Sequence, residues 1–210
     1  MKKQFPVILV ALLAITLGAI AGKSGLIGGQ ADIQIPNMKK ATVLPTAKLL
    51  HDFVLLDHNG NAFTKESLKT KHSVMFFGFT NCPDICPITL QFLKTVKSSL
   101  VESGDWDKFQ FIFVSVDTVR DTPEKLSQYV PYFDKEFIGL TGELANMEAF
   151  AKQLSMPYVI HEKDENGNYF VDHSASLVVM DRQGDMKAII SPPHKKQEIV
   201  DDLLAISRLN

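Results

Sequence analysis

A short apolar run followed by two cysteines constrains the fold of this 210-residue chain more than any other feature. Residues 74–79 are uninterrupted by polar side chains and rich in phenylalanine, which predicts a buried strand. Cys82 and Cys86 come directly after it. Pro87 stands where a first helical turn would begin, because its fixed φ and missing N–H suit that position. The sequence therefore predicts that both cysteines lie on a strand-to-helix turn.

This placement has chemical consequences for the cysteine pair. The N-terminus of a helix carries partial positive charge, which favours a thiolate over a thiol, and the thiolate is the form that attacks disulfides and binds soft metals. No other cysteine is present, so Cys82 and Cys86 form the only possible internal disulfide. We expect a reactive pair.

The composition is that of one globular domain with an additional segment. Hydrophobic residues make up 45% of the chain, charged residues 22%, and the formal net charge is -2. A balance so close to neutral gives no indication of a nucleic-acid partner.

The first 22 residues are predicted to be a membrane anchor or a signal segment. Lys2 and Lys3 precede an uncharged, mostly apolar stretch, and positive charge there keeps the N-terminus in the cytoplasm. We expect a single retained span in the cell (inner) membrane, with the domain on the periplasmic or extracytoplasmic face. Cleavage after Ala21 is the alternative, because about 17 apolar residues is the lower limit for a span.

Residues 23–47 are predicted to be a linker and residues 48–210 the folded domain. The linker contains glycines, Pro36 and Pro45 and has little apolar periodicity. Segments 53–56 and 62–63 flank an Asn-Gly turn, which predicts a hairpin. The next elements expected are a short helix at 65–68, a helix ending near 102, strands at 109–116 and 137–140, and helices at 123–133 and 143–154.

The alternation of strands and helices implies a mostly parallel central sheet. Segments 158–161 and 169–171 surround a second Asn-Gly turn and predict another hairpin. Two antiparallel strands at 175–180 and 186–190 follow, with a closing helix from Pro192-Pro193 to Leu203. This order predicts an α/β fold of thioredoxin-like type, in its peroxiredoxin-like variant, with a central sheet, flanking helices and added hairpins.

The cysteine spacing indicates a possible metal site in addition to redox chemistry. A Cys-x-x-Cys pair would indicate thiol-disulfide exchange. Three residues separate Cys82 from Cys86, which widens the distance between the sulfurs and makes room for a metal ion.

Four motifs resemble those of the Sco/SenC proteins, exported copper-binding factors for cytochrome c oxidase with a thioredoxin-like fold. They are GFTNCPDICP at 78–87, SVDTVRDTPEKLSQY at 115–129, GLTG at 139–142 and VDHSAS at 171–176. The resemblance runs from about residue 50 to the last helix. Thr118 and Leu177-Val178 depart from the usual pattern, at positions away from the metal ligands.

The resemblance implies that Cys82, Cys86 and His173 are copper ligands. Two thiolates and an imidazole are soft and borderline donors that suit Cu(I) and can also hold Cu(II), and zinc is the nearest competitor.

Four further residues are expected to support the site. Asp84 lies between the cysteines and could bond the turn backbone or modulate the charge of the thiolates. Asp117 and Arg120 follow a core strand at the sheet edge where ligand sites of α/β folds lie, with a surface ion pair as the alternative. Asp172 directly precedes the histidine ligand.

Four of the remaining five histidines are expected to play no part in the site. His51, His58, His72 and His194 are predicted to be solvated in turns or near helix starts, while His161 could approach the ligands from the second hairpin.

These features predict a copper protein that passes copper, or reducing equivalents, to the copper-binding subunit of cytochrome c oxidase. Other copper chaperones and thiol oxidoreductases are further candidate partners. A metallochaperone is favoured, and a thiol-disulfide oxidoreductase that reduces cysteines of the oxidase subunit or other exported proteins is the alternative. A peroxidase is the weaker alternative, since the second cysteine and the histidine motif argue against it.

Overall fold

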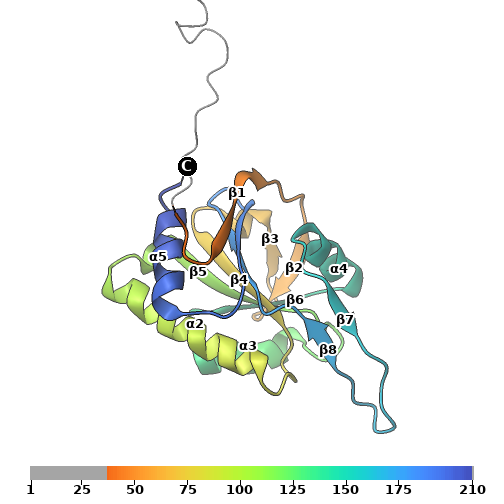
Figure 1. Cartoon of the computed structure of the whole chain (residues 1–210). Helices are drawn as coiled ribbons and strands as arrows, with labels where there is room; N and C mark the ends of the chain where they lie inside the picture. The colour runs from red at the N-terminus through yellow and green to blue at the C-terminus, as the bar shows by residue number, and fades with distance from the viewer. Residues whose placement is uncertain (1–36, 210) are drawn as a thin grey trace, which may run out of the picture. The chain divides into compact units, whose positions relative to one another are not determined.

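The computed structural model describes residues 37–209, which fold around an eight-stranded sheet. The strand order is β1-β10-β9-β4-β5-β6-β2-β3, and β7 and β8 form a separate two-stranded sheet. Helices cover both faces of the large sheet (Figure 1). The strands are β1 Ala41–Lys48, β2 Val54–Asp57, β3 Ala62–Thr64, β4 His72–Gly78, β5 Phe109–Ser115, β6 Ile138–Thr141, β7 Tyr158–Ile160, β8 Val171–His173, β9 Leu177–Met180 and β10 Met186–Ile190. The helices are α2 Ile85–Glu102, α3 Pro123–Phe133, α4 Leu144–Gln153 and α5 Lys196–Ile206, with 3-10 turns η1 Lys65–Leu68 and η2 Trp106–Lys108.

Strand β4 is buried over its whole length because its side chains enter two cores in alternation. Val74 and Phe76 pack with residues of α2, α3 and α5 on one face of the sheet. Met75 and Phe77 pack with residues of α4 on the other face. A strand covered on both faces has no polar side, which explains the continuous apolar run in the sequence.

The sheet is mixed, so the predicted mostly parallel sheet is wrong. Only β4 with β5 and β5 with β6 run parallel, and α2 and α3 make the crossovers between them. The hairpins β2-β3 and β9-β10 add antiparallel strands on the two sides, and β1 pairs antiparallel with β10. The predicted hairpin at 53–63 and the predicted antiparallel strands at 175–180 and 186–190 are confirmed, and it is their addition to the same sheet that makes it mixed.

The predicted linker at 23–47 ends in a strand, so this boundary is corrected. β1 occupies Ala41–Lys48 and pairs with β10, with Ala41 opposite Ile190. The buried carboxylate of Asp202 accepts the backbone N–H groups of residues 39, 40 and 41 at 2.6–2.7 Å. β1 is an edge strand that contains Pro45, and its weak apolar pattern did not indicate a strand in the sequence. The predicted anchor at 1–22 and linker residues 23–36 lie outside the described residues. In residues 37–209, no helix combines the length and apolar character that crossing a membrane requires.

Two helices begin at other residues than predicted. α2 begins at Ile85, so Pro87 is its third residue, a position that also lacks an intrahelical partner for its N–H. α5 begins at Lys196, after the cis-linked Pro192-Pro193 pair. A proline pair is as compatible with a loop as with a first helical turn.

Three histidines predicted to be solvated make contacts within the fold instead. His72 is 3% exposed and its ring lies 5.8 Å from that of Phe109. His58 Nδ1 accepts a hydrogen bond from the Gly139 N–H at 2.9 Å, and His194 Nε2 donates to the Ala175 carbonyl at 2.9 Å. The position of a histidine in a predicted turn does not indicate whether its imidazole points to solvent or packs against the fold.

Candidate metal centre

The two cysteines lie in the connection from β4 to α2, at the carboxyl end of the parallel strands, where ligand sites of α/β folds occur. Cys82 is half-buried, and its N–H donates to the Phe79 carbonyl at 3.2 Å. Cys86 is the second residue of α2 and has no exposed surface. Both are free thiols. The predicted strand-to-helix placement is therefore confirmed.

Gly78 makes the close approach of α2 to β4 possible. A Cβ atom on this residue would lie 2.5 Å from Cys86 Sγ and 2.9 Å from the ring of Phe113. Neither neighbour has room to move in a closely packed interior. Glycine at the end of β4 thus sets the position of the Cys86 sulfur.

The structure brings the three predicted ligands together. The ligand atoms of Cys82, Cys86 and His173 all lie within 4.8 Å of one another, and Cys86 Sγ is 3.5 Å from His173 Nε2. His173 is the last residue of β8, in the small sheet, and is half-buried. The two parts of the site, 87 residues apart, are therefore joined only by folding. Metal ligation by these residues stays a prediction.

The imidazole of His173 is oriented by its surroundings. Its Nδ1 lies 3.2 Å from the Ser174 carbonyl oxygen, and because a carbonyl can only accept, Nδ1 carries the proton of this bond. The Nε2 lone pair is then free to face the sulfurs. The rings of Phe76 and Phe79 each lie 5.8 Å from the imidazole in edge-on geometry. The ring is thus oriented as a metal ligand would need to be.

Burial opposes charge on two of the three groups. It raises the pKa of the Cys86 thiol far above its ordinary value, although the Phe79 backbone acts in the opposite direction. Burial of Cys86 therefore acts against the predicted preference for thiolate. Burial also lowers the pKa of His173, which keeps the imidazole neutral, the form that binds metals. A bound cation would supply the charge that stabilises the Cys86 thiolate.

Asp117 and Arg120 form a largely buried ion pair beside the three predicted ligands. The Asp117 carboxylate is fully buried, pairs with Arg120 Nε and accepts the Tyr169 hydroxyl at 2.6 Å. The Arg120 guanidinium donates to the Tyr169 carbonyl at 3.1 Å and stacks 3.5 Å from the Tyr169 ring. It also lies 5.7 Å from Phe79, which packs on His173. The alternative of a surface ion pair is excluded, and the pair joins the end of β5 to the segment before β8.

Asp84 and Asp172 are less closely involved than predicted. Asp84 is exposed at the N-cap of α2, and its side chain makes no capping hydrogen bond, contrary to the predicted bond with the turn backbone. Asp172 is exposed and meets His161 Nε2 at 2.7 Å. Successive side chains of a strand point to opposite sides, so Asp172 faces away from the His173 ring. His161 accordingly pairs with Asp172 rather than with the ligands.

Asp121 is a supporting residue that the sequence reasoning missed. Its fully buried carboxylate accepts the Thr80 N–H at 2.7 Å, the Thr80 hydroxyl at 2.5 Å and the Ser115 hydroxyl at 2.6 Å. These bonds fix the loop that leads to Cys82. The sequence could have indicated this contact, because Asp121 follows β5 and Thr80 follows β4. Loops that follow adjacent parallel strands meet at the same edge of the sheet. The position next to Thr122-Pro123 instead suggested only a helix start.

The donor set limits what the centre can do. Two sulfurs and one imidazole nitrogen suit Cu(I), Cu(II) or zinc, and the oxygen ligands that magnesium and calcium need are not among the three. The same sulfurs can close to a disulfide after a local movement, since both thiols are free. Metal binding and thiol-disulfide exchange are therefore the two chemistries open to this site.

Comparison with known proteins identifies related sequences and structures. A model of the SCO1/SenC family matches residues 41–208. An SCO2-like protein of Rickettsia conorii is 33% identical over 187 residues, which cover 85% of this chain and 85% of that protein.

Two solved structures with copper bound resemble the fold. ScoI of Arabidopsis thaliana gives a TM-score of 0.71 at 30% identity and covers 76% of this chain and 98% of its own. ScoI of Bradyrhizobium japonicum gives a TM-score of 0.67 at 33% identity, with coverage of 76% and 98%. The predicted thioredoxin-like α/β fold is confirmed by these similarities.

Proposed function

This chain belongs to the SCO1/SenC family, and from that premise we propose that it binds copper and delivers it to the copper site of cytochrome c oxidase. The protein takes up one copper ion through Cys82, Cys86 and His173 and passes it to the copper-binding subunit. Copper-bound relatives of similar fold support this choice of metal over zinc.

The observation that carries the proposal is the convergence of three soft and borderline donors from two distant segments. Their ligand atoms lie within 4.8 Å of one another. Cys82 is half-buried while Cys86 is enclosed, so an incoming ligand can approach the Cys82 side of the centre. Transfer then proceeds by exchange of one protein ligand at a time, which an enclosed site would prevent.

Elemental analysis of the reduced protein tests metal binding. We expect one copper per chain, and Cys82→Ser or Cys86→Ser should abolish tight binding because one thiolate and the imidazole alone hold Cu(I) poorly. An unchanged copper content in Cys82→Ser would contradict the proposal.

The location of the protein is part of the proposal. Lys2 and Lys3 before an apolar stretch support a single N-terminal span in the cell (inner) membrane, with the domain on the periplasmic or extracytoplasmic face. An alkaline phosphatase fusion after Ile35 should be active. An inactive fusion would refute export, and a soluble mature chain that starts at Gly22 would refute the anchor.

A thiol-disulfide oxidoreductase is the second candidate, favoured by the two free thiols. In this reaction the thiols of Cys82 and Cys86 are oxidised to a disulfide while a disulfide of the oxidase subunit is reduced to two thiols. Such exchange does not require an imidazole ligand. His173→Ala should therefore abolish oxidase assembly at low copper if copper delivery is the function. Normal oxidase activity in that variant, with both cysteine variants inactive, would support the reductase.

A further inference from the structure

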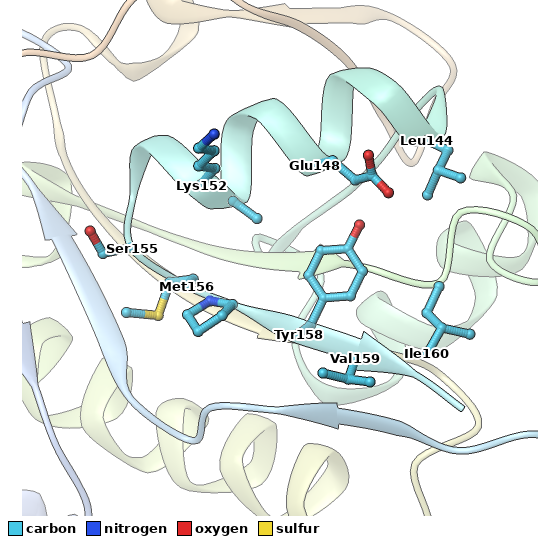
Figure 2. A pocket seen from close by; sticks show the side chains of 10 residues that line it. Leu144, Glu148, Lys152, Ser155, Met156, Tyr158, Val159 and Ile160 are labelled. Carbon is cyan, nitrogen blue, oxygen red and sulfur yellow. The ribbon is translucent and has the colours of Figure 1, made fainter. Parts of the chain in front are cut away.

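A groove with an apolar floor runs between α4 and β7, apart from the three metal-ligand residues. Its volume is about 600 Å³. One stripe of α4 supplies Leu144, Glu148, Ala151 and Lys152, and β7 supplies the opposite wall, with the Tyr158 side chain directed toward the helix (Figure 2). Large apolar side chains remain exposed here, 43% for Leu144 and 39% for Ile160. Exposed apolar groups that gather along a groove are characteristic of an interaction surface.

The groove is bordered by an unpaired strand edge. Within residues 37–209, β7 has only β8 as a strand partner. The His161 N–H donates to the Phe170 carbonyl at 3.0 Å, and Val159 stands opposite Asp172, so the backbone groups of residues 159 and 161 face β8. The N–H and C=O groups of Tyr158 and Ile160 therefore face the open edge. An extended peptide can satisfy such groups, whereas a lipid chain cannot.

Two polar features add specificity. Lys152 and the Lys48–Ser155 hydrogen bond of 3.1 Å place positive charge near the start of β7, while Glu148 stands beside Tyr158 (Figure 2). The Tyr158 hydroxyl is buried and has no hydrogen-bond partner in the described part of the chain. A peptide with an acidic residue toward Lys152 and a basic residue toward Glu148 would complement this wall.

The groove is also continuous with the candidate metal centre through the small sheet. Tyr158 stands directly opposite His173 in the pairing of β7 with β8. A strand added to β7 would extend this sheet to three strands, and three strands hold their geometry better than an isolated pair. Occupation of the groove would thereby fix the position of the histidine ligand.

We infer that this groove binds an extended segment of the protein that exchanges copper with this chain, and that the segment adds to β7 as a third strand. The segment carries apolar side chains at alternate positions and the two charges described above. The inference rests on the proposed function, because its partner is the copper-binding subunit of cytochrome c oxidase.

The test uses the full chain in detergent, loaded with copper, and the soluble copper-binding domain of the oxidase subunit as the probe. Ile160→Pro removes only an N–H that faces the open edge, and Leu144→Lys places a charge in the groove. Val54→Lys is the matched control, since Val54 in β2 is 55% exposed and does not line the groove. We expect the first two variants to weaken binding by about tenfold or more and the control to stay within about twofold, with copper content unchanged.

Hydrogen exchange of the complex distinguishes strand addition from side-chain contact alone. The amides of Tyr158 and Ile160 should become protected when the oxidase domain binds. Unchanged affinity in both groove variants, or a complex without this protection, would overturn the inference. So would the absence of a complex although copper binds.

Two other outcomes are separable. Self-association that Ile160→Pro abolishes would assign the groove to a second copy and overturn the inference. Failure of the unmodified chain to bind copper would contradict the proposed function itself. Intact copper binding together with unchanged affinity of the groove variants for the oxidase domain would contradict the groove inference alone.

Discussion

The cysteine half and the histidine half of the candidate metal centre are held by different parts of the molecule. Cys82 and Cys86 follow β4, a fully buried strand with neighbours on both sides in the large sheet. His173 ends β8, a three-residue strand that pairs only with β7 among residues 37–209. The core of the large sheet thus fixes the sulfurs, whereas the imidazole comes from a two-stranded sheet and packs on Phe76 and Phe79.

This difference suggests that the sulfur ligands and the imidazole ligand differ in how easily they move. Segments with few buried contacts open more easily than the core. We therefore expect the sulfurs to remain in place while the imidazole can be released and regained. A copper carrier needs ligands that retain the ion until the recipient arrives and one ligand that is exchanged first. Disturbing the two halves should consequently have different effects.

The largest effect is expected on the cysteine side, from Gly78→Ala. The added methyl group would lie 2.5 Å from Cys86 Sγ, so α2 must shift. Overpacking of this kind should lower the free energy of unfolding by about 2 kcal/mol or more and also abolish tight copper binding. Chemical denaturation and copper titration measure the two effects.

Gly139→Ala is the control for Gly78→Ala. A Cβ at Gly139 would approach Val130 Cγ2 at 2.9 Å, which is also too close but involves α3 rather than a cysteine. This variant should lose stability and keep its copper. If Gly78→Ala retained full copper affinity, the account of how β4 positions Cys86 would be wrong.

A smaller and local effect is expected on the histidine side, from Tyr169→Phe. The change removes the hydroxyl that donates to Asp117 while Arg120 still neutralises the carboxylate. The free energy of unfolding should fall by about 1 kcal/mol. Hydrogen exchange should quicken in β7 and β8 but not in β4. Equal acceleration in β4 would show that the two halves are not held separately.

The smallest effect concerns His72, at the opposite end of β4 from the cysteines. Burial, followed by the positive charge of Arg182, lowers the pKa of His72 below its ordinary value of 6.5, while the Met180 backbone and then Asp181 act in the opposite sense. The unfolded chain therefore binds a proton more readily, and stability falls as the pH drops below 6.5. In His72→Leu this acid-induced loss should be smaller by about 1 kcal/mol or less. Denaturant unfolding at pH 7 and pH 5 measures the difference, and an identical loss in both proteins would refute a neutral, buried His72.

The sequence was most informative where a pattern has one physical cause. The apolar run of β4 requires burial on both faces, and it located the strand and the turn that carries Cys82 and Cys86. His173 was different, because no periodicity connects it with the cysteines, and its role came from the resemblance of its motif. The structure supports that grouping by bringing the three ligand atoms within 4.8 Å of one another.

The remaining features depend on tertiary contacts that a sequence does not display. β1 is an edge strand whose partners, β10 and Asp202, lie far along the chain. The raised pKa of Cys86 follows from its complete burial, which the helix-terminus reasoning did not weigh. Asp121 resembled a helix start locally, and only the neighbouring loop reveals its bonds to Thr80.

The coordination of bound copper tests the central claim most directly. X-ray absorption at the copper edge should be recorded on the Cu(I)-loaded and Cu(II)-loaded protein and on the same forms of His173→Ala. The account predicts two sulfur ligands and one imidazole nitrogen in the unmodified protein, and loss of the imidazole signal in the variant, with Cu(II) affinity reduced more than Cu(I) affinity. Copper without an imidazole ligand in the unmodified protein, or with an unchanged spectrum in His173→Ala, would contradict it.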